Sequence, residues 1–509
     1  MTRRPLEVIE AAGGRLRAAL ADPVRGGRAL AATLAAYALL WALYGVIAKS
    51  GQDVHPDMAE LVTWAREPAL GYFKHPPFAA WLTAAWFAVF PVADWSYYLL
   101  AALMPTLALA LIAAIAADYL DADERVAGLA LMTLVPFFGV IALKFNVNTV
   151  LIPLWAATAL CFLRAFERRS ALWGALAGAC AAAAMLTKYW SIFLVIGLVL
   201  AALMDRRRRD YLRTASPWIT VAVGGALIAP HLVWLVTNEF PPLRYVSAAH
   251  QPASLVDSAR SALTYLLGSA GYVALPVVIA LAAARIDRAA AHDLLWPQDA
   301  ARRLAARAFF LPLLLPVFAA IALAVEITSI WSMSAFALLP VVLLSSPRIA
   351  LPRPAVDRIV AFAVAFPLVM LAASPLVAVA VHRAGLPPEQ TQGSLVAPAL
   401  DALWRAATPA PLRIVGGDNA FALAFYLPER PSAFPDFNTA EAIWMDEARV
   451  RRDGLAMACR ADNAGCVASA ARRAAAVPGA RTADVTVART SFGLAGAPAT
   501  YRLWALPPH

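Results

Sequence analysis

Charged residues are scarce in this sequence. Asp, Glu, Lys and Arg together make up 15% of its 509 residues, whereas hydrophobic residues make up 61%. Such a chain is too apolar for a soluble enzyme. Apolar runs of about 20 residues, long enough to cross a bilayer as a helix, recur along most of the chain. The runs are dominated by Ala and Leu, which favours helices over a barrel. The sequence therefore predicts an all-α, multi-spanning membrane protein.

Carboxylates are nearly absent from the long apolar runs, and the sequence shows no internal repeat. Transporters tend to place ionisable residues at mid-membrane and often contain repeats. The scarcity of carboxylates in the apolar runs and the lack of a repeat favour chemistry at a membrane surface over transport. A transporter or flippase for a lipid-linked sugar is the alternative function.

Cysteine is also rare, with four residues. Cys161 and Cys180 fall in apolar runs and are expected to be packing residues. Cys459 and Cys466 lie close together in a polar tail, where a disulfide is expected if the tail is periplasmic. Two unpaired thiols are the alternative. No spacing resembles a metal site, and we expect no metal or other cofactor.

We predict about eleven membrane spans. They are expected near residues 27–49, 95–117, 126–143, 149–166, 171–187, 190–204, 215–237, 260–284, 308–325, 329–346 and 359–381. Arginines concentrate in every second connection, as at Arg206 to Arg209, which places the N-terminus in the cytoplasm and the C-terminal tail in the periplasm. The net charge of +10 therefore reflects membrane orientation, and no nucleic-acid partner is expected. The aromatic stretch 76–91 is expected to lie flat on the membrane surface, with a full span as the alternative.

The polar segment from Gly51 to Pro77 follows the first apolar run. Its chemically capable side chains are Asp53, His55, Asp57, Glu60, Trp64, Tyr72, Phe73, Lys74 and His75. A helix starting near Pro56 would stabilise Asp57 as the anion, which suits a general base. Lys74 and His75 would suit an anionic, partly apolar substrate such as a lipid phosphate. An ordinary polar loop between two membrane helices is the alternative.

This segment resembles the first periplasmic loop of polyprenyl-phosphate-sugar-dependent glycosyltransferases. That family includes protein O-mannosyltransferases and lipid A aminoarabinose transferases. Asp57 matches the family's first acid, Trp64 its tryptophan, and Gly71 to Pro77 its Gly-Tyr-Phe-x-His-Pro-Pro element. Met58 stands where the family has its second acid, which leaves Asp57 as the expected base and Glu60 as a stand-in.

The resemblance implies a C-type glycosyltransferase fold and transfer from a polyprenyl-phosphate sugar to a lipid or glycan acceptor. The Leu-Thr-Lys-Tyr string at Lys188 resembles a recurring family element, and Arg244 lies on the outer side, where positive charge is scarce. Lys74, His75, Lys188 and Arg244 are therefore expected to bind the donor phosphate in some combination. Asp53, His55, Trp64, Tyr72, Asn146, Asn148, Tyr189 and His231 are expected to line the substrate cavity. Relatives carry an aspartate near Asn148, so a catalytically inactive relative is a further alternative.

Several of these residues have structural alternatives. The asparagines could cap a helix, Lys188 could extend to the interface, and His231 could be a buried helix contact. We predict a transmembrane domain at 1–383, with its catalytic loop at 50–94, and a soluble periplasmic domain at 384–509. The tail has strand-like and helix-like pieces, so this second domain is expected to be a small α/β domain.

Overall fold

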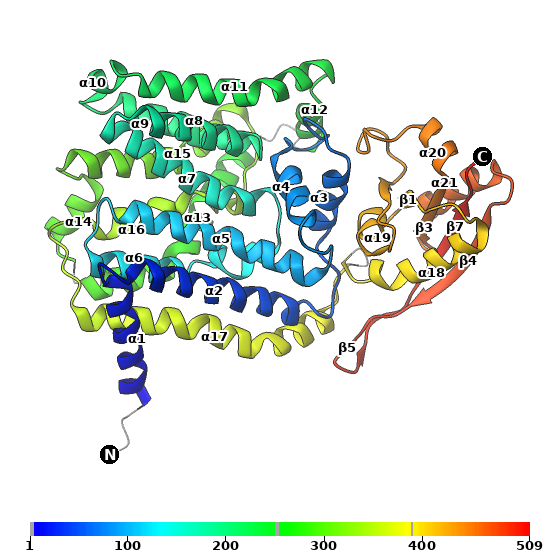
Figure 1. Cartoon of the computed structure of the whole chain (residues 1–509), viewed down its shortest axis with the longest axis horizontal. Coiled ribbons are helices and arrows are strands. Elements are labelled where there is room, and N and C mark those ends of the chain that lie inside the picture. Colours follow the sequence, from blue (N-terminus) through cyan, green and yellow to red (C-terminus); the bar gives the residue numbers. More distant parts are fainter. Residues whose placement is uncertain (1–4, 250–253, 285, 388–389) are drawn as a thin grey trace. The chain divides into compact units, whose positions relative to one another are not determined.

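The computed structural model describes residues 5–249, 254–284, 286–387 and 390–509. Within these residues the chain divides into two compact units. The first comprises Met1–Ala42, Leu99–Leu143 and Val147–Leu371, and the second comprises Leu43–Tyr98, Lys144–Asn146 and Ala372–His509. Among the described residues the first unit is helical, and all strands belong to the second (Figure 1).

Long helices dominate the first unit. The α-helices that lie wholly or mostly in it are α1 (Pro5–Ala21), α2 (Gly26–Ala48), α5 (Asp94–Ala116), α6 (Ala122–Met132), α7 (Val147–Arg168), α8 (Ala171–Met185), α9 (Ile192–Leu203), α10 (Arg208–Leu212), α11 (Ser216–Thr237), α12 (Pro241–Ala249), α13 (Leu255–Ala284), α14 (Arg288–Leu295), α15 (Ala300–Leu323), α16 (Leu339–Leu344) and α17 (Arg353–Ala384). Short 3₁₀ helices are η1 (Pro136–Phe138), η2 (Val140–Leu143), η3 (Tyr189–Ser191), η4 (Ser329–Ser332) and η5 (Ala335–Leu338).

Among the described residues, seven helices are long and apolar enough to cross a membrane. They are α2, α5, α7, α11, α13, α15 and α17, and each coincides with an expected span. The expected spans at 126–143, 171–187, 190–204 and 329–346 fall on shorter helices or on helices joined to 3₁₀ turns. The all-α membrane body is therefore confirmed, while the number of spans stays a prediction.

Helices α8 and α11 pack closely because small residues line their contact. A Cβ atom built on Gly178 would lie 2.3 Å from the Thr220 carbonyl oxygen, and one on Gly174 would lie 2.4 Å from the Ser216 carbonyl oxygen. Thr220 Oγ1 also donates to the Gly174 carbonyl at 2.9 Å. Close backbone approach and interhelical hydroxyl bonds are the usual means of helix association where no hydrophobic driving force exists between helices.

The second unit combines the first loop with the C-terminal part of the chain. Its helices are α3 (Pro56–Arg66), α4 (Phe78–Phe87), α18 (Gly393–Ala407), α19 (Ala420–Tyr426), α20 (Glu447–Asp453) and α21 (Ala464–Ala475). Its strands are β1 (Ile414–Gly417), β2 (Ser432–Pro435), β3 (Leu455–Arg460), β4 (Arg481–Val487), β5 (Thr490–Ser491), β6 (Leu494–Ala495) and β7 (Ala499–Leu506). Helix α4 has 10 residues, which disfavours a full span over 76–91.

Within residues 390–509, five strands form a sheet in the order β2-β1-β3-β7-β4. Strand β1 is parallel to β2 and β3, whereas β7 is antiparallel to β3 and β4. Side chains alternate between two cores: Val415 packs with α18 and α19, and Ile414 with α20 and α21. Cys459 on β3 and Cys466 on α21 form a disulfide. The C-terminal part is therefore the small α/β domain that the sequence predicts, although its boundary at residue 384 stays a prediction.

Candidate functional site

Helix α3 begins where the sequence predicts, directly before Asp57. Pro56 occupies the first turn, where its fixed φ suits a helix start. His55 is the N-cap, and its Nδ1 accepts a hydrogen bond from the Asp57 backbone N–H at 3.1 Å. Asp57 therefore lies in the first turn, where the helix dipole favours an anion.

The Asp57 carboxylate faces cationic and amide groups. Asn146 Nδ2 donates to Asp57 Oδ2 at 3.0 Å, and Lys144 Nζ lies 3.4 Å from the same oxygen. Burial raises the pKa of Asp57, but Lys144, His55, Asn146 and Lys74 outweigh it, so the pKa lies below 3.8. The side chain is 33% exposed. Asp57 is thus an ionised carboxylate that a substrate can reach.

His55 is uncharged at neutral pH. Burial lowers its pKa to about 4, and the lysines at 144, 49 and 74 lower it further, against the opposing effect of Asp57. Because Nδ1 accepts a hydrogen bond, the neutral ring carries its proton on Nε2. His55 therefore supports Asp57 as a cap and offers one N–H donor.

Glu60 and Lys74 are paired with each other. Lys74 Nζ lies 2.9 Å from Glu60 Oε2 and 3.2 Å from Oε1. Burial raises the pKa of Glu60 to about 7, although Lys74 acts in the opposite direction. The sequence assigns these residues to separate roles, a second acid and a phosphate ligand, and both roles stay predictions. In this structure each supplies the counter-charge of the other.

The loop's aromatic residues form a buried framework. Trp64 and Tyr72 stack with ring centroids 4.9 Å apart, and His75 packs edge-on against Trp64 at 6.2 Å. The Tyr72 hydroxyl donates to the Trp64 carbonyl at 2.7 Å. Both stacked side chains are at most 1% exposed. They fix the shape of the loop, and their role in lining a substrate cavity stays a prediction.

Asp53 differs from Asp57 in being fully buried. Its carboxylate forms an ion pair with Arg489 and accepts a hydrogen bond from Ser394 Oγ at 2.6 Å. Both partners come from the C-terminal part of the second unit. The described contacts of Asp53 are therefore those of a structural anchor, and its expected place in a substrate cavity stays a prediction.

In the first unit, Lys188 lies between an amide and an indole. Lys188 Nζ donates to Asn148 Oδ1 at 2.8 Å, and it lies 4.6 Å from the centre of the Trp331 ring. Asn148 is in the first turn of α7, and Lys188 is the N-cap residue of η3. A cation placed over an indole is stabilised by the electrons of the ring. This arrangement presents an oriented ammonium group.

Tyr189 and His231 contact each other in the same unit. The Tyr189 hydroxyl and His231 Nε2 are 2.8 Å apart, and the two rings stack at 5.8 Å. His231 is 1% exposed. His231 is thus a buried, hydrogen-bonded contact between η3 and α11, and its expected place in a substrate cavity stays a prediction.

A mostly apolar cavity of about 380 Å³, whose lining also includes Glu326, lies in the first unit. Its wall includes Trp190, Phe193, Leu243, Pro316, Leu323 and Trp331. Trp331 is also the ring under the Lys188 ammonium, so a cationic group adjoins the wall of an apolar cavity. Arg244, next to Leu243 on α12, forms an exposed ion pair with Glu239 at 2.9 Å.

Sequence reasoning did not select Lys144 or Trp331. The only sequence signal for Lys144 was a positive charge on the side where such charge is scarce. Trp331 falls within the expected span at 329–346, where an aromatic residue is typical of ordinary packing. Their contacts with Asp57 and Lys188 join residues far apart in the chain, which no local pattern predicts.

Comparison with known proteins first indicates a class. Residues 74–234 match the sequence model of the dolichyl-phosphate-mannose-protein mannosyltransferase family. The matched region includes Lys74, His75, Asn146, Asn148, Lys188, Tyr189 and His231. Asp57 precedes it. No curated protein sequence gives a significant match to the chain.

Comparison with solved structures then identifies a particular protein of similar fold. ArnT from Cupriavidus metallidurans bound to undecaprenyl phosphate matches with a TM-score of 0.62 at 13% sequence identity, over 93% of this chain and 97% of that chain. The same protein in the apo state matches with a TM-score of 0.59 at 14% identity, over the same shares. The predicted fold class, an all-α membrane body with a small strand-containing C-terminal domain, is therefore confirmed, and the fold is similar to that of ArnT.

Proposed function

We propose that this chain is a glycosyltransferase of a bacterial inner membrane. It transfers a sugar from a polyprenyl phosphate to a lipid or glycan acceptor, such as lipid A or another envelope glycan. The observation that carries the proposal is the ionised, partly exposed Asp57 in the first turn of α3, held by Lys144 and Asn146. The matched family and the ArnT structure bound to undecaprenyl phosphate support a polyprenyl-phosphate donor.

Asp57 acts on the acceptor. The acceptor hydroxyl oxygen attacks the anomeric carbon of the sugar, and its proton passes to the Asp57 carboxylate. The bond between the anomeric carbon and the phosphate oxygen breaks, and the polyprenyl phosphate leaves with that electron pair. One such displacement inverts the anomeric configuration. Because a carboxylate of low pKa is a weak base, Asp57 accepts the proton late, after the leaving bond has lengthened.

Cationic residues act on the donor. Charge develops on the departing phosphate, and a fixed cation lowers the free energy of the transition state most at that point. Lys188 meets this need because Asn148 and Trp331 hold its ammonium in place. The apolar cavity that Trp331 lines suits part of a prenyl chain. Lys74, His75 and Arg244 are further candidates for the phosphate.

The transfer is proposed to take place at the periplasmic face. The arginine-rich connections assign the N-terminus to the cytoplasm, and the loop at 50–94 and the C-terminal domain to the periplasm. An acceptor that is itself an envelope lipid or glycan is available on that side.

The test is transfer of labelled sugar from polyprenyl phosphate in membranes that contain the wild type or Asp57→Asn. The amide keeps the shape of the side chain but cannot take a proton. General-base catalysis typically contributes about 10²- to 10⁴-fold, so turnover should fall by at least roughly 10²-fold.

Asp462→Asn is the matched control, because Asp462 has a 67% exposed side chain in the C-terminal domain. It should leave turnover unchanged. Full turnover by a normally folded Asp57→Asn protein would show that the assigned base is wrong.

A further inference from the structure

Helix α3 is held at its start by residues from the C-terminal part of the chain. Asp53 is 1% exposed and pairs with Arg489, whose Nε also donates to the Thr391 carbonyl at 2.7 Å. The Asp53 backbone N–H donates to the Gln390 carbonyl at 2.7 Å. The next N–H, of Val54, donates to the Tyr426 hydroxyl at 2.9 Å. The chain therefore enters the helix from a fixed position.

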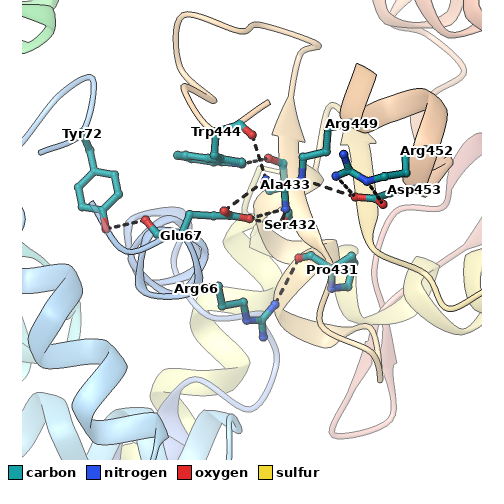
Figure 2. Close-up of polar contacts among 10 residues, drawn as sticks. All are labelled: Arg66, Glu67, Tyr72, Pro431, Ser432, Ala433, Trp444, Arg449, Arg452 and Asp453. Carbon is teal, nitrogen blue, oxygen red and sulfur yellow. Dashed lines mark hydrogen bonds and ion pairs between the residues drawn. The ribbon is translucent and has the colours of Figure 1, made fainter. Parts of the chain in front are cut away.

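The end of α3 is held in the same way. Glu67 is its C-cap residue. Arg449 of α20 donates two hydrogen bonds to the Glu67 carboxylate, from Nη2 to Oε1 at 2.8 Å and from Nη1 to Oε2 at 3.3 Å (Figure 2). Ser432 of β2 contacts both Glu67 and Arg449. Arg66 Nη1 donates to the carbonyls of Ala424 and Pro431 at 3.0 and 3.3 Å.

Glu67 also connects α3 to the Gly71–Pro77 element of the loop. Its backbone carbonyl accepts a hydrogen bond from the Tyr72 hydroxyl at 3.0 Å, and Figure 2 shows Glu67 between Tyr72 and Ser432. Arg449 is itself oriented, because its Nη1 donates to the Trp444 carbonyl at 2.9 Å. The Glu67–Arg449 pair is thus held in place by contacts of both residues, and it is a two-nitrogen ion pair at this end of the helix.

These contacts determine the position of α3, because a helix this short is only marginally stable without them. It has 11 residues, and isolated helices shorter than about 12–15 residues are marginal in water. A catalytic group must be held within about 0.5 Å of its working position. Asp57 lies in the first turn of this helix, so any shift of α3 moves the Asp57 carboxylate relative to Lys144 and Asn146.

We propose that Glu67 and Arg449, together with Asp53 and Arg489, are positioning residues for the transfer reaction, by which the C-terminal domain holds the Asp57 helix in register. This inference rests on the proposed function of Asp57. Neither pair touches the reacting atoms. Their effect is on turnover, through the placement of Asp57.

The experiment compares Glu67→Gln and Arg449→Gln with wild type in the labelled-sugar assay. A small misplacement of a reacting group can cost about 100-fold, so kcat should fall by roughly 10- to 100-fold while KM for the polyprenyl-phosphate donor changes little. The double variant Glu67→Arg with Arg449→Glu reverses the pair and should recover kcat relative to either single variant.

The pH profile separates positioning from a general structural role. Lys144 and Asn146 help to keep the pKa of Asp57 low. A loosened α3 weakens these contacts, so the acidic limb of kcat should move to higher pH in the single variants. Arg451→Gln is the matched control, because Arg451 lies on the same helix as Arg449 and its side chain is exposed. It should keep the kcat and the pH profile of wild type.

Hydrogen exchange gives a second measurement that does not depend on activity. Amides of residues 57–66 should exchange faster in Glu67→Gln, while those of β3 and β7 should not change. If Asp57→Asn is inactive and both single variants match wild type in kcat and acidic limb, the positioning role is overturned and the proposed function stands. If wild type transfers no sugar, the proposed function fails. If Asp57→Asn keeps full turnover, the role assigned to Asp57 is wrong. In either case, unchanged exchange in α3 of Glu67→Gln would show that the Glu67–Arg449 pair does not hold the helix.

Discussion

Asp57 and Glu60 lie three positions apart on one helix but have opposite acid strengths. Lys144, His55, Asn146 and Lys74 keep the pKa of Asp57 below 3.8 against the effect of burial. Burial dominates at Glu60 and raises its pKa to about 7. Two carboxyl groups separated in this way can take different roles at one pH. Asp57 stays ionised throughout the neutral range, whereas Glu60 titrates within it.

Titration of Glu60 should control the availability of Lys74. Below about pH 7 Glu60 gains a proton and stops neutralising the Lys74 ammonium. If Lys74 binds the donor phosphate, KM for the donor should fall as the pH is lowered from about 8 to about 6. Glu60→Gln cannot titrate, so its KM should show no such step. The measurement is donor KM as a function of pH for both proteins.

Stability provides an independent check on the same group. The pKa of Glu60 in the folded protein lies above its ordinary value of 4.5, so proton binding favours the folded state. This contribution is fully present below about pH 4.5 and is lost as the pH rises through about 7. The melting temperature of wild type should therefore decline more across this interval than that of Glu60→Gln. Parallel curves would contradict the assignment.

At the level of single residues, the sequence predicted the local structure around Asp57. Asp57, the helix start at Pro56 and the Gly71–Pro77 element could be found because each depends on neighbours in the chain. The partners of Glu60 and Asp53 could not be predicted in the same way. Whether Lys74 faces a carboxylate or a phosphate depends on how the loop folds back, and Arg489 is 436 positions from Asp53.

Among the elements, the pair α8 and α11 shows how closely helices approach in this protein. A side-chain carbon at Gly178 would collide with the backbone of α11, whereas Gly225 on α11 has no atom within 4 Å of a built Cβ. Both glycines are within helices, where alanine is otherwise favoured by about 1 kcal/mol.

Gly178→Ala should therefore destabilise the membrane body by roughly 1–3 kcal/mol, because the helices must move apart. The measurement is the melting temperature in detergent. Gly225→Ala is the matched control and should leave it unchanged or slightly higher. Equal melting temperatures for the two variants would show that the contact between α8 and α11 tolerates an added methyl group.

Element prediction succeeded where hydrophobic length or alternation was decisive. The long helices α2, α5 and α17 were predicted from apolar runs, and the α/β domain from strand-like and helix-like pieces in the tail. The region at 329–346 reads as one continuous span, but the structure divides it into η4, η5 and α16. Tertiary packing decides such breaks, because the local sequence is apolar on both sides of them.

At the scale of the whole molecule, the compact units of the structure are discontinuous in the sequence. Composition changes near residue 384 and predicts a domain boundary there. In the structure, Ala372–His509 belongs to one compact unit together with Leu43–Tyr98 and Lys144–Asn146, and the boundary at residue 384 stays a prediction. Buried ion pairs such as Asp53–Arg489 unite these stretches, and composition carries no information about them.

The proposed orientation can be tested by thiol labelling. In a protein with Cys161 and Cys180 replaced by alanine, Ala440→Cys should react with a membrane-impermeant maleimide added to the periplasmic side. Ala440 is exposed in the C-terminal domain, and the disulfide pair at Cys459 and Cys466 does not react. Ala12→Cys on α1 is the control and should react only after the membrane is opened. The reverse pattern would contradict the proposed topology.

The discontinuous make-up of the second unit has a consequence for biosynthesis. The ribosome delivers Asp53 and Glu67 early, but their counter-charges Arg489 and Arg449 emerge only near the end of translation. Until then the nascent loop carries two carboxylates without the arginines that balance them. A truncated product that stops after α17 would keep every long apolar helix and the Asp57 segment, yet it would never assemble the support that holds that segment in place.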